Sequence, residues 1–183
     1  NYDINFVCFN KKNFVGNKRM IPAGPLRENL NKIGEYKNIF LVGNDEDETI
    51  LRKKFTNKFS NLNFYGCSYK PLNLKHFDLN HKYLIFSGIG NHGTFVEMLL
   101  KHNFKIFDDI EYPDHYNYTE KDIDNMNKTA LENNLNILTT EKDFVRLNKK
   151  NQTNINYIKV FLEIKEKEKL KNQLMNLLNE KKN

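Results

Sequence analysis

The chain has 183 residues, a formal net charge of +6 at pH 7 and a sequence pI of about 9.1. Hydrophobic residues make up 39% and aromatic residues 13%, which excludes a disordered chain and predicts a packed core. No run of about 18 apolar residues occurs, so the sequence predicts no membrane-spanning helix. The positive charge comes from lysines spread over every segment, and we therefore expect no nucleic-acid partner.

The first part of the chain has the pattern of two buried strands around a long loop. Apolar residues run from 4 to 9 and again over Asn38–Val42, as in strands of a sheet core. Glycines and prolines between 16 and 25 predict an ordered loop with unusual backbone angles. A surface helix is expected at 45–59, and the weakly patterned residues 60–80 follow it. Because the chain opens directly on an apolar strand, we expect it to be a piece of a longer protein.

The second part of the chain repeats a strand–loop–helix unit. This alternation predicts an α/β fold with a mostly parallel sheet and right-handed crossovers. In such a sheet the strand-to-helix loops all emerge at the carboxyl edge, so residues distant in sequence are expected to meet there. Strands are expected at 83–86, 104–110, 136–139 and 155–164, and helices at 94–102, 119–133 and 165–180, with a short helix after 139.

The first of these loops matches G-x-G-x-x-G at Gly88–Gly93, directly before a helix. Asp108, Asp109 and Glu111 follow at about 20 residues, the distance of a ribose-binding carboxylate. This spacing is typical of a dinucleotide-binding unit, in which backbone amides approach a pyrophosphate. A tight turn that merely needs glycine is the alternative, and the spacing leaves both open.

The next loop carries an acid beside a histidine, Asp114-His115, after Pro113. This pair at the carboxyl edge of a strand could orient a base or bind phosphate. A turn carboxylate with an exposed imidazole is the alternative. Thr119 and Asp122 have capping-box spacing, which predicts that a helix begins here.

The third loop is the polar run 139–143, Thr-Thr-Glu-Lys-Asp. Thr140 and Asp143 have the spacing of a helix cap, and helix initiation alone explains the run. Its functional interpretation is a helix N-terminus whose amides, with Lys142 and Arg146 beside them, hold an anion.

The cysteines and three of the histidines show no ligand pattern. Cys8 and Cys67 have neither metal-ligand spacing nor a C-x-x-C partner, so we expect reduced thiols in a cytosolic protein. His76, His81 and His102 stand in polar surroundings and are interpreted as surface residues. The sequence therefore predicts no zinc site.

Several blocks of the sequence form one ordered pattern. They are Gly16-Asn17 with Pro22–Glu28, Asn44 after an apolar strand, Ser87–Asn91 with Phe95, Tyr112–His115, and Thr139–Asp143 with Val145-Arg146. In content and order this pattern resembles the tetraacyldisaccharide 4'-kinase family, from about Asp3 to Arg146. Two positions depart from the family: Asn10 replaces the usual Asp, and His92 stands where Pro is frequent. The Gly-Ile-Gly turn is shared with the family, which makes the dinucleotide match look accidental.

The resemblance implies a reaction and a place for it. The family transfers the γ-phosphoryl group of ATP, with Mg²⁺, to the 4'-hydroxyl of a tetraacylated glucosamine disaccharide 1-phosphate at the cytoplasmic face of the bacterial inner membrane. Its phosphate loop lies in an N-terminal lobe, and no G-x-x-x-x-G-K-[ST] occurs in this sequence. We therefore expect the chain by itself to be inactive.

The resemblance also implies site residues. His115 is expected to assist a catalytic base from the other lobe, with Asp114 orienting it. Arg27 and Glu28 are expected on the nucleotide side, with Glu28 as a Mg²⁺ ligand; an arginine in a lysine-biased chain fits a need for a bidentate fork. Thr140, Lys142 and Arg146 are expected either to bind the substrate phosphate or to hold the lobes together.

The expected domains follow from these assignments. Residues 1–60 would be the C-terminal part of a P-loop-type nucleotide-binding lobe, 61–71 a connector, and 72–183 a smaller α/β lobe. Two other classes of protein remain as alternatives: a dinucleotide-binding Rossmann-like module of an oxidoreductase, and a non-catalytic basic binding module.

Overall fold

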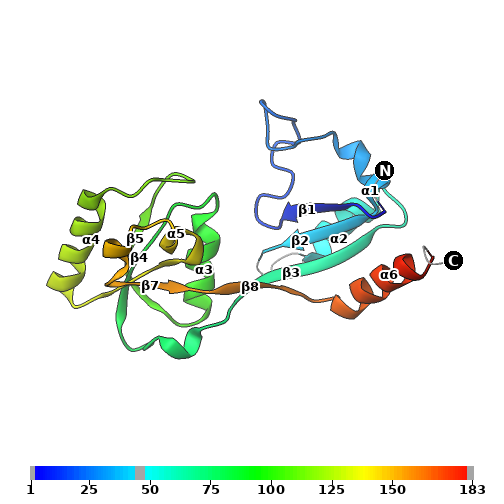
Figure 1. Cartoon of the computed structure of the whole chain (residues 1–183). Coiled ribbons are helices and arrows are strands. Elements are labelled where there is room, and N and C mark those ends of the chain that lie inside the picture. The colour runs from blue at the N-terminus through cyan, green and yellow to red at the C-terminus, as the bar shows by residue number, and fades with distance from the viewer. Residues whose placement is uncertain (1–2, 44–47, 181–183) are drawn as a thin grey trace. The chain divides into compact units, whose positions relative to one another are not determined.

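The computed structural model describes residues 3–43 and 48–180 (Figure 1). The strands are β1 (Phe6–Asn10), β2 (Asn38–Val42), β3 (Asn63–Pro71), β4 (Lys82–Ser87), β5 (Lys105–Glu111), β6 (Asn136–Thr140), β7 (Ile155–Ile158) and β8 (Val160–Ile164). The helices are α1 (Ile33–Tyr36), α2 (Glu48–Thr56), α3 (His92–Lys101), α4 (Glu120–Asn133), α5 (Glu141–Phe144) and α6 (Lys167–Glu180). None of these described helices is long and apolar enough to cross a membrane.

The chain divides into two compact units. The first unit comprises residues 1–69 and 162–183, and the second comprises 70–161. These limits differ from the expected ones, because most of the proposed connector 61–71 is strand β3 of the first unit. The last 22 residues, 162–183, belong to the first unit and not to the expected lobe 72–183. Local sequence patterns carry no information about such a return of the chain.

The first unit is built on a sheet with the strand order β1-β2-β3-β8. β2 runs parallel to both β1 and β3, so the core strands are joined by crossovers. Ile39 and Leu41 alternate along β2 onto one face and are fully buried. Leu51 and Phe55 of α2 belong to the same core. The expected strand Asn38–Val42 is confirmed at both ends.

Strand β3 was not predicted, and its burial explains why it forms. The run Phe64–Ser68 is buried at every position, as in a strand covered on both faces. Gly66 suggested a connector, yet a Cβ there would lie 2.7 Å from both carboxylate oxygens of Glu48. The glycine therefore permits close approach of a side chain to the sheet. The neighbouring Cys67 is a buried free cysteine, and burial raises its pKa to about 11.

The second unit is built on an all-parallel sheet with the order β5-β4-β6-β7. The central strand β4 carries the continuous apolar run Tyr83–Phe86, and its side chains alternate between two cores. Tyr83 and Ile85 pack with residues of α3 on one face. Leu84 and Phe86 pack with residues of α4 on the other. This confirms the expected α/β fold with a mostly parallel sheet.

The expected single strand 155–164 is two strands in different sheets. β7 pairs with β6, whereas β8 completes the sheet of the first unit beside β3. Lys159 separates them, and its backbone is bound on both sides: its carbonyl accepts from Leu72 N at 2.8 Å and its N–H donates to Asn73 Oδ1 at 2.8 Å. These bonds take the place of pairing in a sheet.

Candidate functional site

The loop that begins at Gly16 is ordered by its own polar contacts, as expected. Asn17 Nδ2 donates to the carbonyl of Ala23 at 2.7 Å, and Arg19 N donates to Asn17 Oδ1 at 3.1 Å. A Cβ at Gly24 would lie 2.4 Å from the Arg19 carbonyl, so only glycine fits. The Gly-Asn and Pro-Ala-Gly-Pro segments therefore contact each other directly. These contacts fix the backbone of the loop just before Arg27.

Arg27 and Glu28 line the same pocket of about 500 Å³, together with Cys8 and Asn10 of β1. Arg27 is exposed and makes no hydrogen bond or ion pair with the residues that the structure describes. Glu28 is also exposed and accepts a hydrogen bond from the hydroxyl of Tyr36. This hydrogen bond raises the pKa of Tyr36, so the hydroxyl stays a donor. A free guanidinium and a carboxylate thus open onto one cavity.

Asn10 has a local structural role. Its Oδ1 accepts from the backbone N–H groups of Lys12 at 2.8 Å and Asn13 at 3.2 Å. The side chain thereby caps the turn that leaves β1. A carboxylate could accept the same two bonds, so the departure from the family's Asp keeps the turn. Asn44, another residue of the resemblance, lies outside the described residues.

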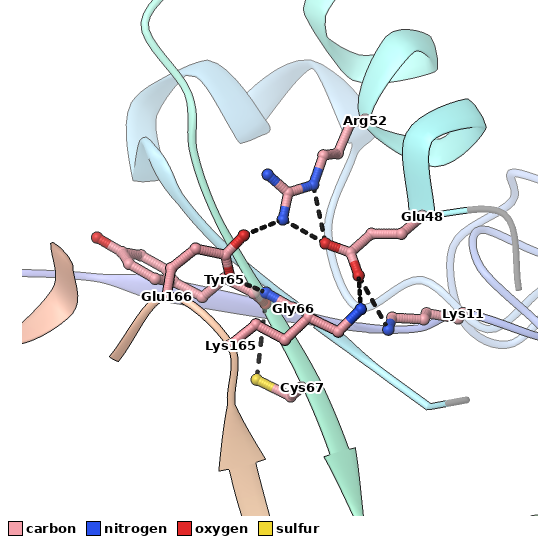
Figure 2. Close-up of polar contacts among 8 residues, drawn as sticks. All are labelled: Lys11, Glu48, Arg52, Tyr65, Gly66, Cys67, Lys165 and Glu166. Carbon is pink, nitrogen blue, oxygen red and sulfur yellow. Dashed lines mark hydrogen bonds and ion pairs between the residues drawn. The ribbon is translucent and has the colours of Figure 1, made fainter. Parts of the chain in front are cut away.

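Sequence reasoning missed a charge cluster around Glu48 in the first unit, shown in Figure 2. Lys11 Nζ lies 3.2 Å from Glu48 Oε2, and their side chains are only 3% and 11% exposed. Lys165 Nζ donates to the same oxygen at 3.1 Å, and Arg52 Nε donates to Oε1 at 2.9 Å. Burial raises the pKa of Glu48, but the hydrogen bonds from Arg52 and Lys165 and the ion pair with Lys11 outweigh it and leave the pKa lowered.

The same cluster extends to the C-terminal segment. Arg52 also donates to Glu166, and Gly66 N donates to Glu166 Oε2 at 2.7 Å. The i,i+4 spacing of Glu48 and Arg52 was the visible signal for one pair. The contacts with Lys165 and Glu166 span 100 residues of sequence or more, so no local pattern in the sequence indicates them.

In the second unit the three strand-to-helix loops meet at the carboxyl edge, as the parallel topology predicted. Gly88 N donates to Asp143 Oδ2 at 3.2 Å, which joins the first loop to the third. His115 N donates to the Gly88 carbonyl at 3.1 Å, which joins the second loop to the first. Lys142 Nζ donates to Asp114 Oδ1 at 3.3 Å.

Asp114 and His115 are exposed at this edge. His115 Nε2 lies 3.8 Å from Asp114 Oδ2, an ion-pair distance that is too long for a hydrogen bond. Partial desolvation raises the pKa of Asp114. The hydrogen bond from Lys142 and the charge of His115 lower the pKa by more, so the pKa lies below its ordinary value and the carboxyl is ionised at neutral pH. The imidazole is free to meet a group outside the unit.

Thr140 and Arg146 are engaged inside the unit. Thr140 Oγ1 donates to Asp143 Oδ2 at 2.7 Å and accepts from Asp143 N at 3.1 Å, which confirms the predicted cap. Arg146 Nη2 donates to the Tyr116 carbonyl at 2.8 Å, and Nη1 lies 3.6 Å from Asp143 Oδ1. Of the three predicted phosphate-binding residues, Lys142 is the one with an exposed donor.

His92, noted in the sequence only as a departure from the family's frequent Pro, is buried behind the glycine turn. His92 Nδ1 is 2.6 Å from Ser87 Oγ, and Nε2 is 2.5 Å from Asp109 Oδ1. Asp109, one of the acids considered for ribose binding, is thus bound to His92. His102, expected at the surface, is half-buried. Burial lowers its pKa most, and the charges of Lys70 and Lys101 lower it further. No cluster of three potential metal ligands occurs among the described residues.

The mostly parallel sheets, with the loops of the second unit gathered at a carboxyl edge, define an α/β protein of the kind that binds its ligands at strand ends. The sequence model of the tetraacyldisaccharide-1-P 4'-kinase family, LpxK, matches residues 1–179, and the chain belongs to this family.

Two curated relatives carry the name tetraacyldisaccharide 4'-kinase. The protein from Pelagibacter ubique is 46% identical over 180 residues, which cover 98% of this chain and 57% of that protein. The protein from Rickettsia bellii is 34% identical over 147 residues, 79% of this chain and 44% of that protein. The chain thus spans about half the length of its relatives.

A solved structure confirms the fold. The "apo" form of LpxK from Aquifex aeolicus, in complex with ATP, aligns with a TM-score of 0.63 over 97% of this chain and 53% of that chain, at 23% identity. The resemblance to the kinase family is therefore confirmed, and the oxidoreductase alternative finds no support. The expected site residues stay predictions.

Proposed function

We propose that the chain is part of a tetraacyldisaccharide 4'-kinase, which transfers the ATP γ-phosphoryl group to the 4'-hydroxyl of a tetraacyldisaccharide 1-phosphate. The observation that carries this proposal is the family match over residues 1–179, which includes both units. The curated relatives from Pelagibacter ubique and Rickettsia bellii bear the name of that enzyme.

Arg27 supplies a nucleotide contact from the first unit. The pocket that it lines holds about 500 Å³, within the usual range for small-molecule sites. Its guanidinium has no partner among the described residues, so both N–H edges are available to a phosphate. This free fork fits an ATP phosphate.

Glu28 supplies one carboxylate to Mg²⁺. Magnesium bound to nucleotides usually takes one or two protein carboxylates and completes its shell with phosphates and water. Glu28 accepts one hydrogen bond from Tyr36, and a carboxylate has capacity for further contacts. A single carboxylate facing the Arg27 pocket fits this arrangement. When bound, Mg²⁺ neutralises the charge that develops on the transferred phosphoryl group.

His115 acts on the acceptor hydroxyl from the second unit. Its exposed imidazole assists the base that takes the proton leaving the sugar. Asp114, whose Oδ2 lies 3.8 Å from His115 Nε2, orients the imidazole toward that proton.

Lys142 binds the substrate phosphate near this pair. Its side chain is exposed, and Nζ lies 3.3 Å from Asp114 Oδ1, which keeps the ammonium at the loop edge. Thr140 and Arg146 contribute to substrate binding by holding the loops that carry Lys142 and His115.

The lipid disaccharide has acyl chains, so the protein works as a peripheral protein at the cytoplasmic face of the inner membrane. No nucleic acid takes part, because the lysines are spread over the whole chain.

A chimera tests the proposal, with this chain in place of the matching 180 residues of the Pelagibacter ubique relative. With ATP, Mg²⁺ and the tetraacyldisaccharide 1-phosphate, we expect transfer of the γ-phosphate to the lipid. The unmodified relative is the positive control. A folded chimera that transfers no phosphate while the relative does so would overturn the proposal.

A further inference from the structure

Asp143 is a charged side chain with no exposed surface, at the point where the three loops of the second unit meet. Its Oδ2 accepts from Gly88 N at 3.2 Å and from Thr140 Oγ1 at 2.7 Å. Its Oδ1 lies 3.6 Å from Arg146 Nη1. Burying a carboxylate is costly unless it is paired and hydrogen-bonded. Helix capping alone does not require a fully buried carboxylate, since an exposed one caps equally well.

The Gly88 peptide connects Asp143 to His115. The N–H of Gly88 donates to the Asp143 carboxylate, and its carbonyl accepts from His115 N at 3.1 Å. Two hydrogen bonds in series therefore hold the backbone of His115 to a buried anion. The bond from Gly88 N to the Asp143 carboxylate involves a charged group and is therefore stronger than a neutral hydrogen bond. It fixes the Gly88 peptide, and the fixed peptide sets the position of the bond from His115 N to the Gly88 carbonyl.

His115 needs such support because its backbone is strained. Its φ is +63°, a left-handed conformation that is unfavourable for a residue with a Cβ. Residues in such conformations persist where the surroundings over-determine them. The Gly88 carbonyl provides this constraint on one side. On the other, Arg146 binds the carbonyl of Tyr116, the residue after His115, at 2.8 Å while its Nη1 faces Asp143.

We infer that Asp143 is the positioning residue for His115: its carboxylate aligns the imidazole through the Gly88 peptide and through Arg146. The inference rests on the proposed function only in taking His115 as the catalytic imidazole. It assigns to the Thr-Glu-Lys-Asp run a role beyond starting a helix.

The first test uses the chain itself and needs no activity. Asp143→Ala removes both acceptor oxygens, and Asp143→Asn keeps one of them. We expect amide hydrogen exchange at Gly88 and His115 to become faster in the Ala variant, with the Asn variant intermediate. Asp124→Ala, an exposed aspartate of α4, is the matched control and should leave both amides unchanged. Unchanged protection of both amides in Asp143→Ala would overturn the inference.

The second test is a double-mutant cycle in the chimera, with kcat as the readout. A misplacement of about 1 Å costs up to about 100-fold, so we expect Asp143→Ala to lower kcat by up to that amount with KM for ATP unchanged. In the His115→Ala background the same substitution should have almost no further effect on kcat, because its route of action is gone.

The outcomes separate this inference from the function. An equal loss of kcat in both backgrounds shows that Asp143 does not act through His115, and overturns the inference alone. A silent His115→Ala overturns the assignment of His115 and the inference with it. If Asp143→Ala does not fold, Asp143→Asn undergoes the same cycle, with a smaller expected loss and the same criterion.

Discussion

Glu166 Oε2 accepts a hydrogen bond of 2.7 Å from the backbone N–H of Gly66, 100 residues earlier in the chain. Strand β3 and the C-terminal segment of the first unit are thus joined at a residue without a side chain. Because the Glu48 carboxylate occupies the space beside the same glycine, this point of the sheet holds two acids and their cationic partners.

Gly66→Ala should destabilise the first unit. The added Cβ would lie 2.7 Å from the Glu48 carboxylate, which is held by three cations and cannot move freely. We expect a loss of about 1–3 kcal/mol in the free energy of unfolding, measured by urea denaturation. Gly34→Ala is the control, because its Cβ would meet Phe59 at an ordinary 3.4 Å. Equal stability of the two variants would contradict the close approach.

Glu48→Gln should destabilise the protein at neutral pH and much less in acid. The substitution leaves the buried Lys11 ammonium without its anion, which typically costs about 3–5 kcal/mol. The folded-state pKa of Glu48 lies below its ordinary value of 4.5, so the stabilisation is present above pH 4.5 and is lost as the pH falls through the folded-state pKa. Denaturation of both proteins at several pH values measures the difference. A difference that stays constant from neutral pH to below the folded-state pKa would contradict the assignment.

The chain by itself should show no kinase activity. The sequence contains no G-x-x-x-x-G-K-[ST] phosphate loop, whose amides and lysine hold the ATP phosphates in P-loop enzymes. Incubation with γ-labelled ATP, Mg²⁺ and the lipid disaccharide should give no labelled lipid. The chimera is the positive control, and turnover by the chain alone would reverse the assignment of its first unit to an incomplete lobe.

Arg27→Lys in the chimera should lower activity although the charge is kept. A lysine ammonium cannot reproduce the two parallel N–H bonds of a guanidinium to phosphate. We expect KM for ATP to rise by about 10-fold, equivalent to about 1.4 kcal/mol of binding. Arg19→Lys serves as the control, because Arg19 stands outside the pocket lining. Full activity of the Arg27 variant would show that Arg27 is only a surface charge and does not bind ATP.

His115→Ala in the chimera should lower kcat by about 100- to 10,000-fold, the usual contribution of general acid–base assistance. ATP affinity and the melting temperature should change little, since the side chain is 71% exposed. His76→Ala, at another exposed histidine, should be nearly silent. A normal kcat in the folded His115 variant would return the imidazole to the status of a turn residue.

The sequence by itself determined the α/β class, the family and most elements of the second unit. Strand Asn38–Val42 and the capping box at Thr119 depend on short-range patterns, which a sequence displays directly. The meeting of the loops that carry Gly88, His115 and Thr140 was also predictable, because parallel strands end at one edge whatever their side chains.

Only the tertiary structure decided the division of the chain and the buried charges. Strand β3, the break at Lys159 and the return of residues 162–183 to the first unit depend on which strands pair. The Glu48 cluster and the buried Asp143 depend on contacts between residues far apart in sequence. The sequence does not distinguish a buried, paired acid from one in solvent. Burial and partners set the free energy of the charged side chain, and both are known only from the folded structure.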